Sequence, residues 1–513
     1  MKQWLIIILI LSWLGWHLAH PVYLTRSDLG RHIKNGELIL HGNWDVLYKN
    51  FYSYTNPEYP FINHHWLFGV WCYVLWHYFG FTGLSFIYLI LKLFTFYVFF
   101  RCWRRYYSFP LVCAFALLSL PLISLRYDIR PEGISYLFCG LFWWMIDCFQ
   151  QKRLKAHHLI IGSCALQIIW VNTHIFFIIG PILTAIFWWQ ARINREERQA
   201  GVLKKLFWLL LGMCLINPSG IYGFLTPFHI DKAYSIPIIE NGSILYFLQQ
   251  KTFIYTSFFI YFLITLSMLI VPLFFLIKRE GLKKHIFIGL WTLLISLAAI
   301  MGIRMIGLYG FFWMPLSSYV FSKWIETGSI KFRKNITTIL LILGVLISAS
   351  VNFDWKQWPG FGVLPGSNDA AEFFKREKIS GVIFNDYEIG GYLIFHLCPQ
   401  HKLFVDDRME AYPQDFFKRT YVPMQWNDDL WRKMDEYYHF NVIFIRQEQN
   451  AWAIRFLADR LMDRHHWALV FWSDEAAVLL KRNAQNADII RRNEIFLHVN
   501  VKLSWPKDIP YPS

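Results

Sequence analysis

The sequence is poor in charged residues. They make up 17% of the 513 positions, whereas apolar residues make up 56% and aromatic residues 19%. A soluble protein of this length would carry more charge and fewer aromatic side chains. The mean hydropathy of the whole chain is +0.32, although the last third has an ordinary composition. The scarcity of charge excludes a wholly soluble protein and indicates a membrane region followed by a water-soluble one.

Patterned cysteines, repeats and a cleavable leader are also missing. The eight cysteines show no spacing typical of a metal site or a disulfide framework, so they are expected to act as small apolar side chains. No internal repeat and no low-complexity segment is found. The apolar run from Trp4 to Ala19 lacks the small residues that precede a signal-peptide cleavage site. It is expected to remain as the first membrane span.

Long apolar runs are abundant. About 20 residues of helix cross the hydrocarbon core of a bilayer. About eleven runs approach this length, at roughly 3–20, 83–100, 109–125, 133–149, 158–172, 175–190, 206–222, 253–277, 286–303, 306–322 and 336–351. The apolar stretch 66–79 could be a twelfth span or a helix at the outer interface. The chain is therefore predicted to be a polytopic α-helical membrane protein.

The net charge of +15 is concentrated between the apolar runs, which favours membrane topology over nucleic-acid binding. With the N-terminus in the cytoplasm and 66–79 not crossing, the cytoplasmic loops hold 19 Lys and Arg residues and the external loops hold 9. Positively charged loops stay in the cytoplasm. The bias therefore predicts a cytoplasmic N-terminus and an external C-terminus.

The pattern changes from about Asn352 onward. Short apolar runs predict strands, and segments of mixed charge and helical spacing alternate with them. The predicted strands are 381–385, 402–405, 441–445, 468–472 and 476–480, and the predicted helices are 367–377, 414–421, 428–438 and 451–464. Two domains follow: a transmembrane domain over 1–351, which includes an external loop at 21–65, and a soluble external α/β domain over 352–513.

The external loop 21–65 is long and rich in polar groups, as loops with a function often are. Ser27 can cap a helix whose first turn contains Asp28 and whose apolar side includes Leu29 and Ile33. This predicts an amphipathic helix on the outer membrane surface that holds Asp28 at the headgroup level. Asp28 could instead be only a helix-start acid that the macrodipole favours. Further candidates in this loop are His32, His64 and His65, which together with Asp28 could bind a divalent metal.

Ionisable residues gather at the outer ends of the predicted spans. Arg126, Arg130 and Arg304 could bind a phosphate. Arg126 and Arg130 could instead be interface anchors paired with Asp128 and Glu132, whereas Arg304 has no obvious sequence partner. The other candidates at the same level are Asp128, Glu132, His174 and Glu240, and His174 is more often a structural histidine. Lys92 lies near the middle of its span, where a charge is costly. It could contact a phosphate, neutralise a buried acid or extend to the interface.

Two polar pairs follow predicted strands of the soluble domain, at Asn385-Asp386 and Asp407-Arg408. Residues in this position of α/β domains often bind ligands. Turn formation and ion pairing are the favoured interpretation for both pairs.

An ordered series of motifs resembles the GT-C superfamily of membrane glycosyltransferases, such as protein O-mannosyltransferases and lipid A aminoarabinose transferases. The resemblance is to a largely uncharacterised bacterial branch and covers most of the chain. Its motifs are Asp28-Leu-Gly-Arg-His-Ile-Lys-Asn-Gly-Glu37, Phe51-Tyr-Ser-Tyr-Thr55, Asn63-His-His-Trp-Leu67, Arg130-Pro131-Glu132, Trp170-Val-Asn-Thr-His174, Asn217-Pro218-Ser-Gly220, Glu240-Asn241, Asn385-Asp386-Tyr387, Gly390-Gly391-Tyr392 and Asp407-Arg408.

The resemblance implies a multi-pass enzyme of the bacterial cytoplasmic membrane with a periplasmic C-terminal domain. It would transfer a sugar from a polyprenyl-phosphate donor to a glycan, lipid or protein acceptor on the outer face, with inversion and with Asp28 as general base. Arg126, Arg130, Arg304 and Lys92 would then bind the donor phosphate. No cofactor is required by the motifs, and no nucleic acid is expected as partner.

Two other functions are compatible with the sequence. A transporter or flippase for a lipid-linked glycan would be expected to place polar groups near the membrane midplane in repeated halves. No repeat is found, and apart from Lys92 the ionisable groups lie at one face. The third function is a non-catalytic membrane assembly protein whose soluble domain binds partners.

Overall fold

The chain forms two compact units. In the computed structural model, unit 1 comprises Met1–Pro21, Thr82–Pro227 and Ile238–Phe361, and unit 2 comprises Val22–Phe81, Phe228–Pro237 and Gly362–Ser513. The structure describes residues 2–234, 241–249, 253–326, 329–350, 359–447 and 451–496. By contacts, the segment 22–81 therefore belongs with the C-terminal region. The boundary that the sequence places between residues 351 and 352 stays a prediction.

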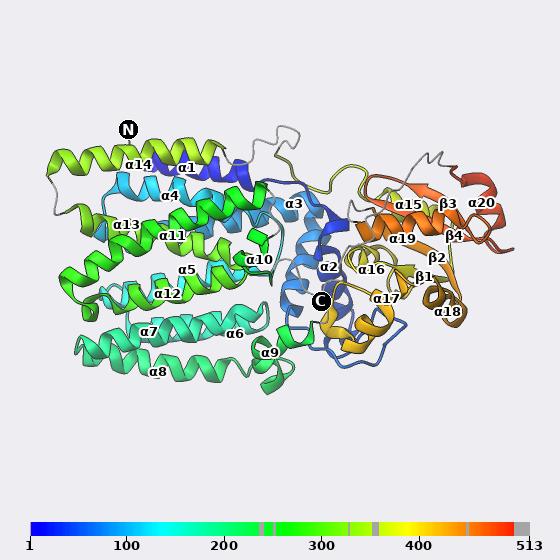
Figure 1. Ribbon diagram of the computed structural model, residues 1–513. Helices are drawn as coiled ribbons and strands as arrows, with labels where there is room; N and C mark the ends of the chain where they lie inside the picture. Colours follow the sequence, from blue (N-terminus) through cyan, green and yellow to red (C-terminus); the bar gives the residue numbers. More distant parts are fainter. Residues whose placement is uncertain are drawn as a thin grey trace. The chain divides into compact units, whose positions relative to one another are not determined.

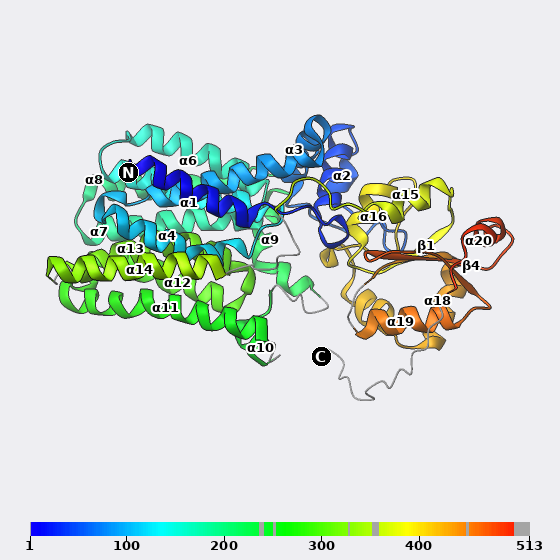
Figure 2. The ribbon, with the colours of Figure 1, turned by 90° about the horizontal axis from the view of Figure 1, so that it is seen from above.

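Unit 1 is a bundle of helices that lie side by side (Figures 1 and 2). Most of them are apolar around their whole circumference, which is typical of helices inside a large core or a membrane. The bundle consists of α1 (Gln3–Leu18), the second part of α3 (Trp66–Arg101), α4 (Phe109–Ser124), α5 (Glu132–Gln150), α6 (Ala156–Val171), α7 (Ile179–Ile193), α8 (Glu197–Met213), α11 (Phe253–Glu280), α12 (Ile286–Met301), α13 (Ile306–Ile325) and α14 (Ile330–Ser350), with the short α10 (Ile244–Gln249). Nearly all of α4 and α13 is buried, so these two helices form the centre of the bundle.

Eleven of these helices overlap the eleven predicted spans. Within the residues that the structure describes, five helical segments are long and apolar enough to cross a membrane by length and composition, namely Trp66–Arg101, Ile175–Ile193, Ser257–Glu280, Leu282–Met301 and Ile330–Ser350. Three shorter apolar helices are Gln3–Leu18, Phe109–Ser124 and Ala156–Val171. The polytopic helical character is confirmed. The number of eleven membrane spans stays a prediction.

The predicted span 206–222 is wrong in its position. Helix α8 ends at Met213, and a turn at Asn217 precedes α9 (Gly220–Ala233). The Asn217 side chain donates to the carbonyls of Cys214 and Gly220, and its oxygen accepts from the Ser219 amide. An asparagine that bonds to nearby backbone in this way competes with the helix. Hydropathy alone did not detect the break.

Helix α3 is interrupted at Gly80, where φ is 63° and ψ is −172°. A residue with a side chain rarely adopts this conformation, whereas glycine does so readily. The segment before the interruption belongs to unit 2, and the segment from Thr82 onward belongs to unit 1. The structure thus separates 66–79 from the following span, and its place in or on the membrane stays a prediction.

Unit 2 contains a four-stranded sheet in the order β1-β2-β4-β3. The strands are β1 (Val382–Asn385), β2 (Phe440–Arg446), β3 (Trp467–Trp472) and β4 (Ala476–Lys481). β1 runs parallel to β2, and β4 runs antiparallel to both β2 and β3. Four of the five predicted strands are thereby confirmed. Their residues are almost all buried, in keeping with the continuous apolar runs.

Helices cover both faces of this sheet. Figure 2 shows α15 (Asp369–Arg376) and α16 (Gly390–Leu397) on one face, and α18 (Asp428–Tyr438) and α19 (Ala451–Met462) on the other. The α15, α18 and α19 helices agree with prediction, whereas 414–421 forms a π-helix at Phe416–Tyr421 followed by the short α17 (Val422–Met424). The last helix is α20 (Ala487–Asn493). The C-terminal region is therefore an α/β structure.

The strand predicted at 402–405 is absent from the described sheet. Leu403 instead forms one parallel bridge with Ser53 in the segment after α2. The Leu403 amide donates to the Tyr52 carbonyl at 2.9 Å, and the Tyr54 amide donates to the Leu403 carbonyl at 3.1 Å. The apolar run was correctly detected, but its backbone pairs with a loop rather than with another strand.

Helix α2 (Leu29–Leu40) is buried in protein. Its apolar residues Leu29 and Ile33 are fully buried, and α2 packs on α16. On another side, a Cβ atom added at Gly36 would lie 2.2 Å from the Gly69 carbonyl oxygen of α3. The apolar face predicted for the membrane surface is therefore covered by protein, which corrects that expectation. The helix itself agrees with prediction, although its N-cap is Asp28 instead of Ser27.

Gly30→Ala is expected to destabilise unit 2. The added Cβ atom would lie 2.7 Å from the Gly391 carbonyl oxygen and 2.9 Å from the Phe395 Cβ atom, so α2 and α16 would have to separate. Overpacking of this kind costs about 1–3 kcal/mol. Thermal unfolding in detergent measures the loss. Gly201→Ala in α8 is the control, because its added Cβ atom meets nothing within 4 Å. Equal melting temperatures for Gly30→Ala and wild type would refute the close packing.

Candidate functional site

In unit 1, a small pocket brings together five of the predicted site residues. It lies where the loop between α4 and α5 meets α3. Its lining consists of Tyr88, Lys92, Arg126, Asp128, Arg130, Glu132, Gly133 and Tyr136. The volume of about 10 Å³ corresponds to about one water molecule. A phosphate group would therefore have to displace the side chains that close the pocket.

Lys92 and Tyr88 hold the backbone of this loop. The buried Lys92 ammonium donates to the carbonyls of Arg126 at 2.6 Å and Asp128 at 3.1 Å. The Tyr88 hydroxyl donates to the Arg130 carbonyl at 2.5 Å and accepts from the Arg130 amide at 3.1 Å. An ammonium can donate three hydrogen bonds, and two of them go to the loop. Lys92 thus acts at least as a tether, a role that the sequence did not suggest.

The loop arginines are paired with loop acids. Arg126 Nε lies 3.0 Å from a Glu132 carboxylate oxygen, and Arg130 Nε lies 3.8 Å from an Asp128 carboxylate oxygen. Arg126 and Arg130 therefore pair with acids of the same loop, as the alternative to phosphate binding expects.

Arg304 lies in the short 3₁₀ helix Ile303–Met305, just before α13. It contacts the same cluster through its backbone. Its carbonyl oxygen accepts from the Tyr136 hydroxyl at 3.4 Å. At Gly307, one turn later, an added Cβ atom would lie 3.3 Å from Arg126 Cγ. Unit 1 thus gathers Lys92, Arg126, Arg130 and the Arg304 backbone around one loop.

His174 is part of a buried hydrogen-bond chain. The Trp170 indole donates to the Ser135 hydroxyl at 2.8 Å, and that hydroxyl lies 2.8 Å from His174 Nδ1. Nδ1 also accepts from the Phe176 amide at 3.4 Å, so Ser135 must donate to it. These contacts favour the structural interpretation of His174. The candidate Glu240 lies outside the described residues.

In unit 2, Asp28 occupies the N-cap position of α2. The N-cap is therefore one residue later than the predicted Ser27, although the Ser27 hydroxyl accepts from the Leu29 amide at 3.1 Å. One Asp28 carboxylate oxygen lies 3.3 Å from Arg31 Nη2 and 3.5 Å from His32 Nε2. The side chain of Asp28 is 28% exposed, whereas that of Arg31 is 7% exposed. Asp28 is thus a partly exposed side chain beside buried donors, and its Oδ1 atom is buried.

The histidines next to Asp28 form a ring cluster. The centroids of His32 and His65 lie 5.5 Å apart, and those of His64 and His65 lie 4.0 Å apart. His64 Nδ1 lies 3.2 Å from the Ile62 carbonyl oxygen. Across the described ranges, no group of three or more His, Cys, Asp or Glu residues is arranged to hold a metal ion. The arrangement of these residues thus gives no support to the metal alternative.

Asp407 is a further carboxyl group in this cluster. Arg31 Nε donates to Asp407 Oδ1 at 2.8 Å. Burial raises the pKa of Asp407 to about 7, and the positive charge of Arg31 opposes that rise. The sequence marked Asp407 only as a residue after an apolar run, and it gave no role to Arg31. Because the two are separated by 376 positions, no spacing rule could have paired them.

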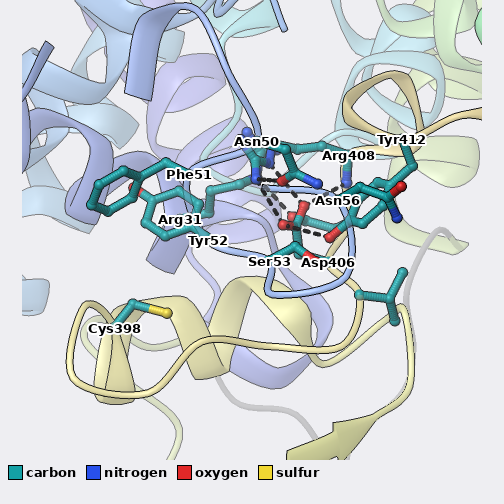
Figure 3. A network of polar contacts seen from close by, with 12 residues as sticks. Arg31, Asn50, Phe51, Tyr52, Ser53, Asn56, Cys398, Asp406, Arg408 and Tyr412 are labelled. Atoms are coloured by element: carbon teal, nitrogen blue, oxygen red, sulfur yellow. Dashed lines mark hydrogen bonds and ion pairs between the residues drawn. The ribbon is translucent and has the colours of Figure 1, made fainter. Parts of the chain in front are cut away.

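Asp406 and Arg408, the two chain neighbours of Asp407, form a buried ion pair with each other, which Figure 3 shows. Arg408 donates to both Asp406 carboxylate oxygens, at 2.8 and 2.7 Å, and both side chains are fully buried. Arg408 also donates to the Asn50 side chain at 2.8 Å, and the Tyr412 hydroxyl donates to Asp406 at 3.0 Å. The expected ion-pair role of Arg408 is confirmed. The network fixes both chain neighbours of Asp407.

Comparisons with known proteins give a fold and no sequence family. No protein-family model matches the chain, and no curated protein matches it. Among solved structures, it is similar to the crystal structure of ArnT from Cupriavidus metallidurans in the apo state. The TM-score is 0.56 with 12% sequence identity, over 93% of this chain and 97% of that chain. The likeness shows that this chain has a fold similar to that of the ArnT structure.

Proposed function

We propose that the protein is a membrane glycosyltransferase that transfers a sugar from a polyprenyl-phosphate donor to an acceptor at the outer face of the membrane. The observation that carries this proposal is the likeness to ArnT, a lipid A aminoarabinose transferase of the GT-C type, over 93% of the chain. The charge bias of the loops supports a cytoplasmic N-terminus and an external C-terminal region in a bacterial cytoplasmic membrane.

The loop between α4 and α5 is the proposed contact for the donor phosphate. Arg126 and Arg130 offer planar forks of N–H groups, which suit phosphate oxygens in a two-bond geometry. A phosphate would replace Asp128 or Glu132 as their partner and open the pocket. Lys92 would keep the loop backbone in place during this exchange, because its ammonium already holds two loop carbonyls. Arg304 is proposed as an additional cation for the same group.

Asp28 is the proposed general base. In an inverting step, the acceptor oxygen forms a bond to the anomeric carbon while the bond from that carbon to the phosphate oxygen breaks. The bonding pair leaves with the polyprenyl phosphate, and Asp28 takes the proton of the acceptor hydroxyl. A carboxylate suits this role because it accepts without donating when ionised. The partial exposure of Asp28 supports the proposal, since an acceptor must reach it.

Transfer by the full-length protein in membranes tests the function. Membranes that contain the wild type receive radiolabelled polyprenyl-phosphate sugars, and label is followed into lipid, glycan and protein fractions. Label that moves from the donor to an acceptor only when the protein is present supports the enzyme. Translocation of an intact labelled donor across the bilayer without transfer would favour the flippase alternative and overturn the proposal.

Arg130→Ala is expected to raise KM for the donor more than it lowers kcat. A hydrogen bond to a charged group contributes about 1.5–3 kcal/mol, which corresponds to a rise of roughly 10- to 150-fold. The measurement is initial transfer rate against donor concentration. Arg192→Ala is the matched control, because Arg192 is an exposed arginine that pairs with Glu197. An unchanged KM in Arg130→Ala would remove Arg130 from the donor site.

A further inference from the structure

We infer that Asp407 is a positioning residue that controls the base Asp28 through Arg31. The inference rests on the proposed function, since it assigns a partner to the proposed base. It adds a residue from the C-terminal region to a site that the sequence placed in the first loop. All three residues belong to unit 2.

Arg31 donates hydrogen bonds to two carboxylates. Arg31 Nε donates to Asp407 at 2.8 Å, and Arg31 Nη2 donates to Asp28 at 3.3 Å. A guanidinium can pair with one carboxylate through two parallel N–H groups, and this pairing is the strong one. Because Arg31 Nε donates to Asp407, Asp28 cannot form a two-bond pair with the Nε and Nη2 groups of Arg31. Asp28 thus keeps only a long single bond to Arg31 and remains the better proton acceptor.

Asp407 is held in this position from several sides. Its neighbours Asp406 and Arg408 are fixed by their buried ion pair. The Tyr387 hydroxyl donates to the Asp407 backbone carbonyl at 3.0 Å. At Gly391, an added Cβ atom would lie 3.2 Å from Asp407 Oδ2 and 3.3 Å from Asp28 Cα, so the first turn of α16 touches both residues. Such a constraint on one carboxyl is expected of a residue that sets the position of another group.

The charged groups around Asp28 and Asp407 determine in which direction Asp407 changes the protonation of Asp28. The groups that act on Asp407 are Arg31 and Asp28 from the α2 side, with Asp406 and Arg408 on its own segment. Glu410, on the same segment, acts on Arg31. Tyr387 faces Asp407 from the segment before α16, and His32 faces Asp28. Asp407 occupies Arg31, and where it is ionised, above its pKa of about 7, it is also a like charge near Asp28. Both effects favour the protonated form of Asp28 relative to a site without Asp407.

Asp407→Asn is therefore expected to shift the acid limb of kcat against pH to lower pH, because the amide, which cannot ionise, holds Arg31 less strongly and leaves it to pair with Asp28. The maximal kcat should fall, because Asp28 would pair more fully with Arg31 and accept a proton less readily. KM for the donor should stay unchanged, since Asp407 is not assigned to the donor. A purely structural defect would lower the amount of active protein without moving the acid limb.

The pH dependence of stability gives a readout that does not require activity. The pKa of Asp407 is raised from 3.8 to about 7 in the folded protein. Between these values the folded state binds the proton more than the unfolded state does, so this group makes stability fall as pH rises. The contribution is constant above about pH 7. Asp407→Asn should abolish this part of the decline in melting temperature between about pH 4 and pH 7 in detergent.

The experiment compares wild type, Asp407→Asn, Asp407→Glu and Asp415→Asn in full-length protein. Asp415 is the control, because its exposed carboxylate pairs with Arg419 on the following segment. We expect the acid limb of kcat and the pH dependence of the melting temperature to change in Asp407→Asn. Asp407→Glu should restore part of both, and Asp415→Asn should match the wild type in both. An active wild type with an unmoved acid limb in both Asp407 variants would overturn the role of Asp407 alone. A folded wild type that transfers no sugar would overturn the proposed function and this role with it.

Discussion

Replacement of Asp28 by asparagine is expected to lower kcat for sugar transfer by roughly 10²- to 10⁴-fold, the usual contribution of a positioned general base. The amide has almost the same shape as the carboxyl group but cannot take the proton. Asparagine is also a favourable N-cap residue, so α2 should form as before. The measurement is turnover of labelled polyprenyl-phosphate sugar at matched protein levels in membranes. KM for the donor should change little, because the proposed donor contacts are other residues.

A second acid in the same loop provides the control for this variant. Asp45 is exposed, and its carboxylate pairs with Lys49 at 3.2 Å. Asp45→Asn therefore removes one negative charge from the segment 22–81 without touching Arg31 or His32. Transfer at the wild-type rate is expected. Equal rates for wild type and Asp28→Asn would show that the proposed base is wrong, whatever the overall reaction.

The second large effect is expected from the buried pair of Asp406 and Arg408. Arg408→Met removes the cation and leaves the Asp406 carboxylate buried without its two shortest donors. Removal of one partner of a buried ion pair costs about 3–5 kcal/mol. The loss should appear as a lower melting temperature and as faster proteolysis of unit 2. Because Arg408 also contacts Asn50, the segment after α2 should be exposed first.

A double variant distinguishes two causes of the stability loss in Arg408→Met, namely the unpaired buried charge of Asp406 and the lost packing of the arginine side chain. Asp406→Leu combined with Arg408→Met removes both charges, and such apolar replacements are often neutral or stabilising. The double variant is therefore expected to regain part of the stability lost in Arg408→Met. Arg419→Met is the exposed control and should stay within about 0.5 kcal/mol of wild type. Equal losses in the single and double variants would contradict the buried-charge explanation.

Hydropathy and local periodicity determined most of the secondary structure. The apolar runs located the helices of unit 1, and β-rich runs located four strands of unit 2, because both signals depend on neighbouring residues. Two predicted elements, the span 206–222 and the strand 402–405, differ in the structure because of contacts that hydropathy does not detect. The Asn217 turn interrupts an apolar run, and 402–405 pairs with the loop at Ser53 instead of with a strand. The sequence could pair Arg126 and Arg130 with the nearby acids Asp128 and Glu132, but it could assign no partner to Asp28.

The tertiary structure alone decided which charged groups meet. Arg31 and Asp407 are 376 positions apart, and Lys92 reaches two carbonyls more than 30 positions away. Such contacts depend on how α2 packs on α16 and how α3 packs beside the α4–α5 loop, and packing is a property of the whole chain. The sequence by itself therefore determined the membrane class, the helices and most strands. Side chains far apart in the chain acquire partners only when the core that holds them has formed.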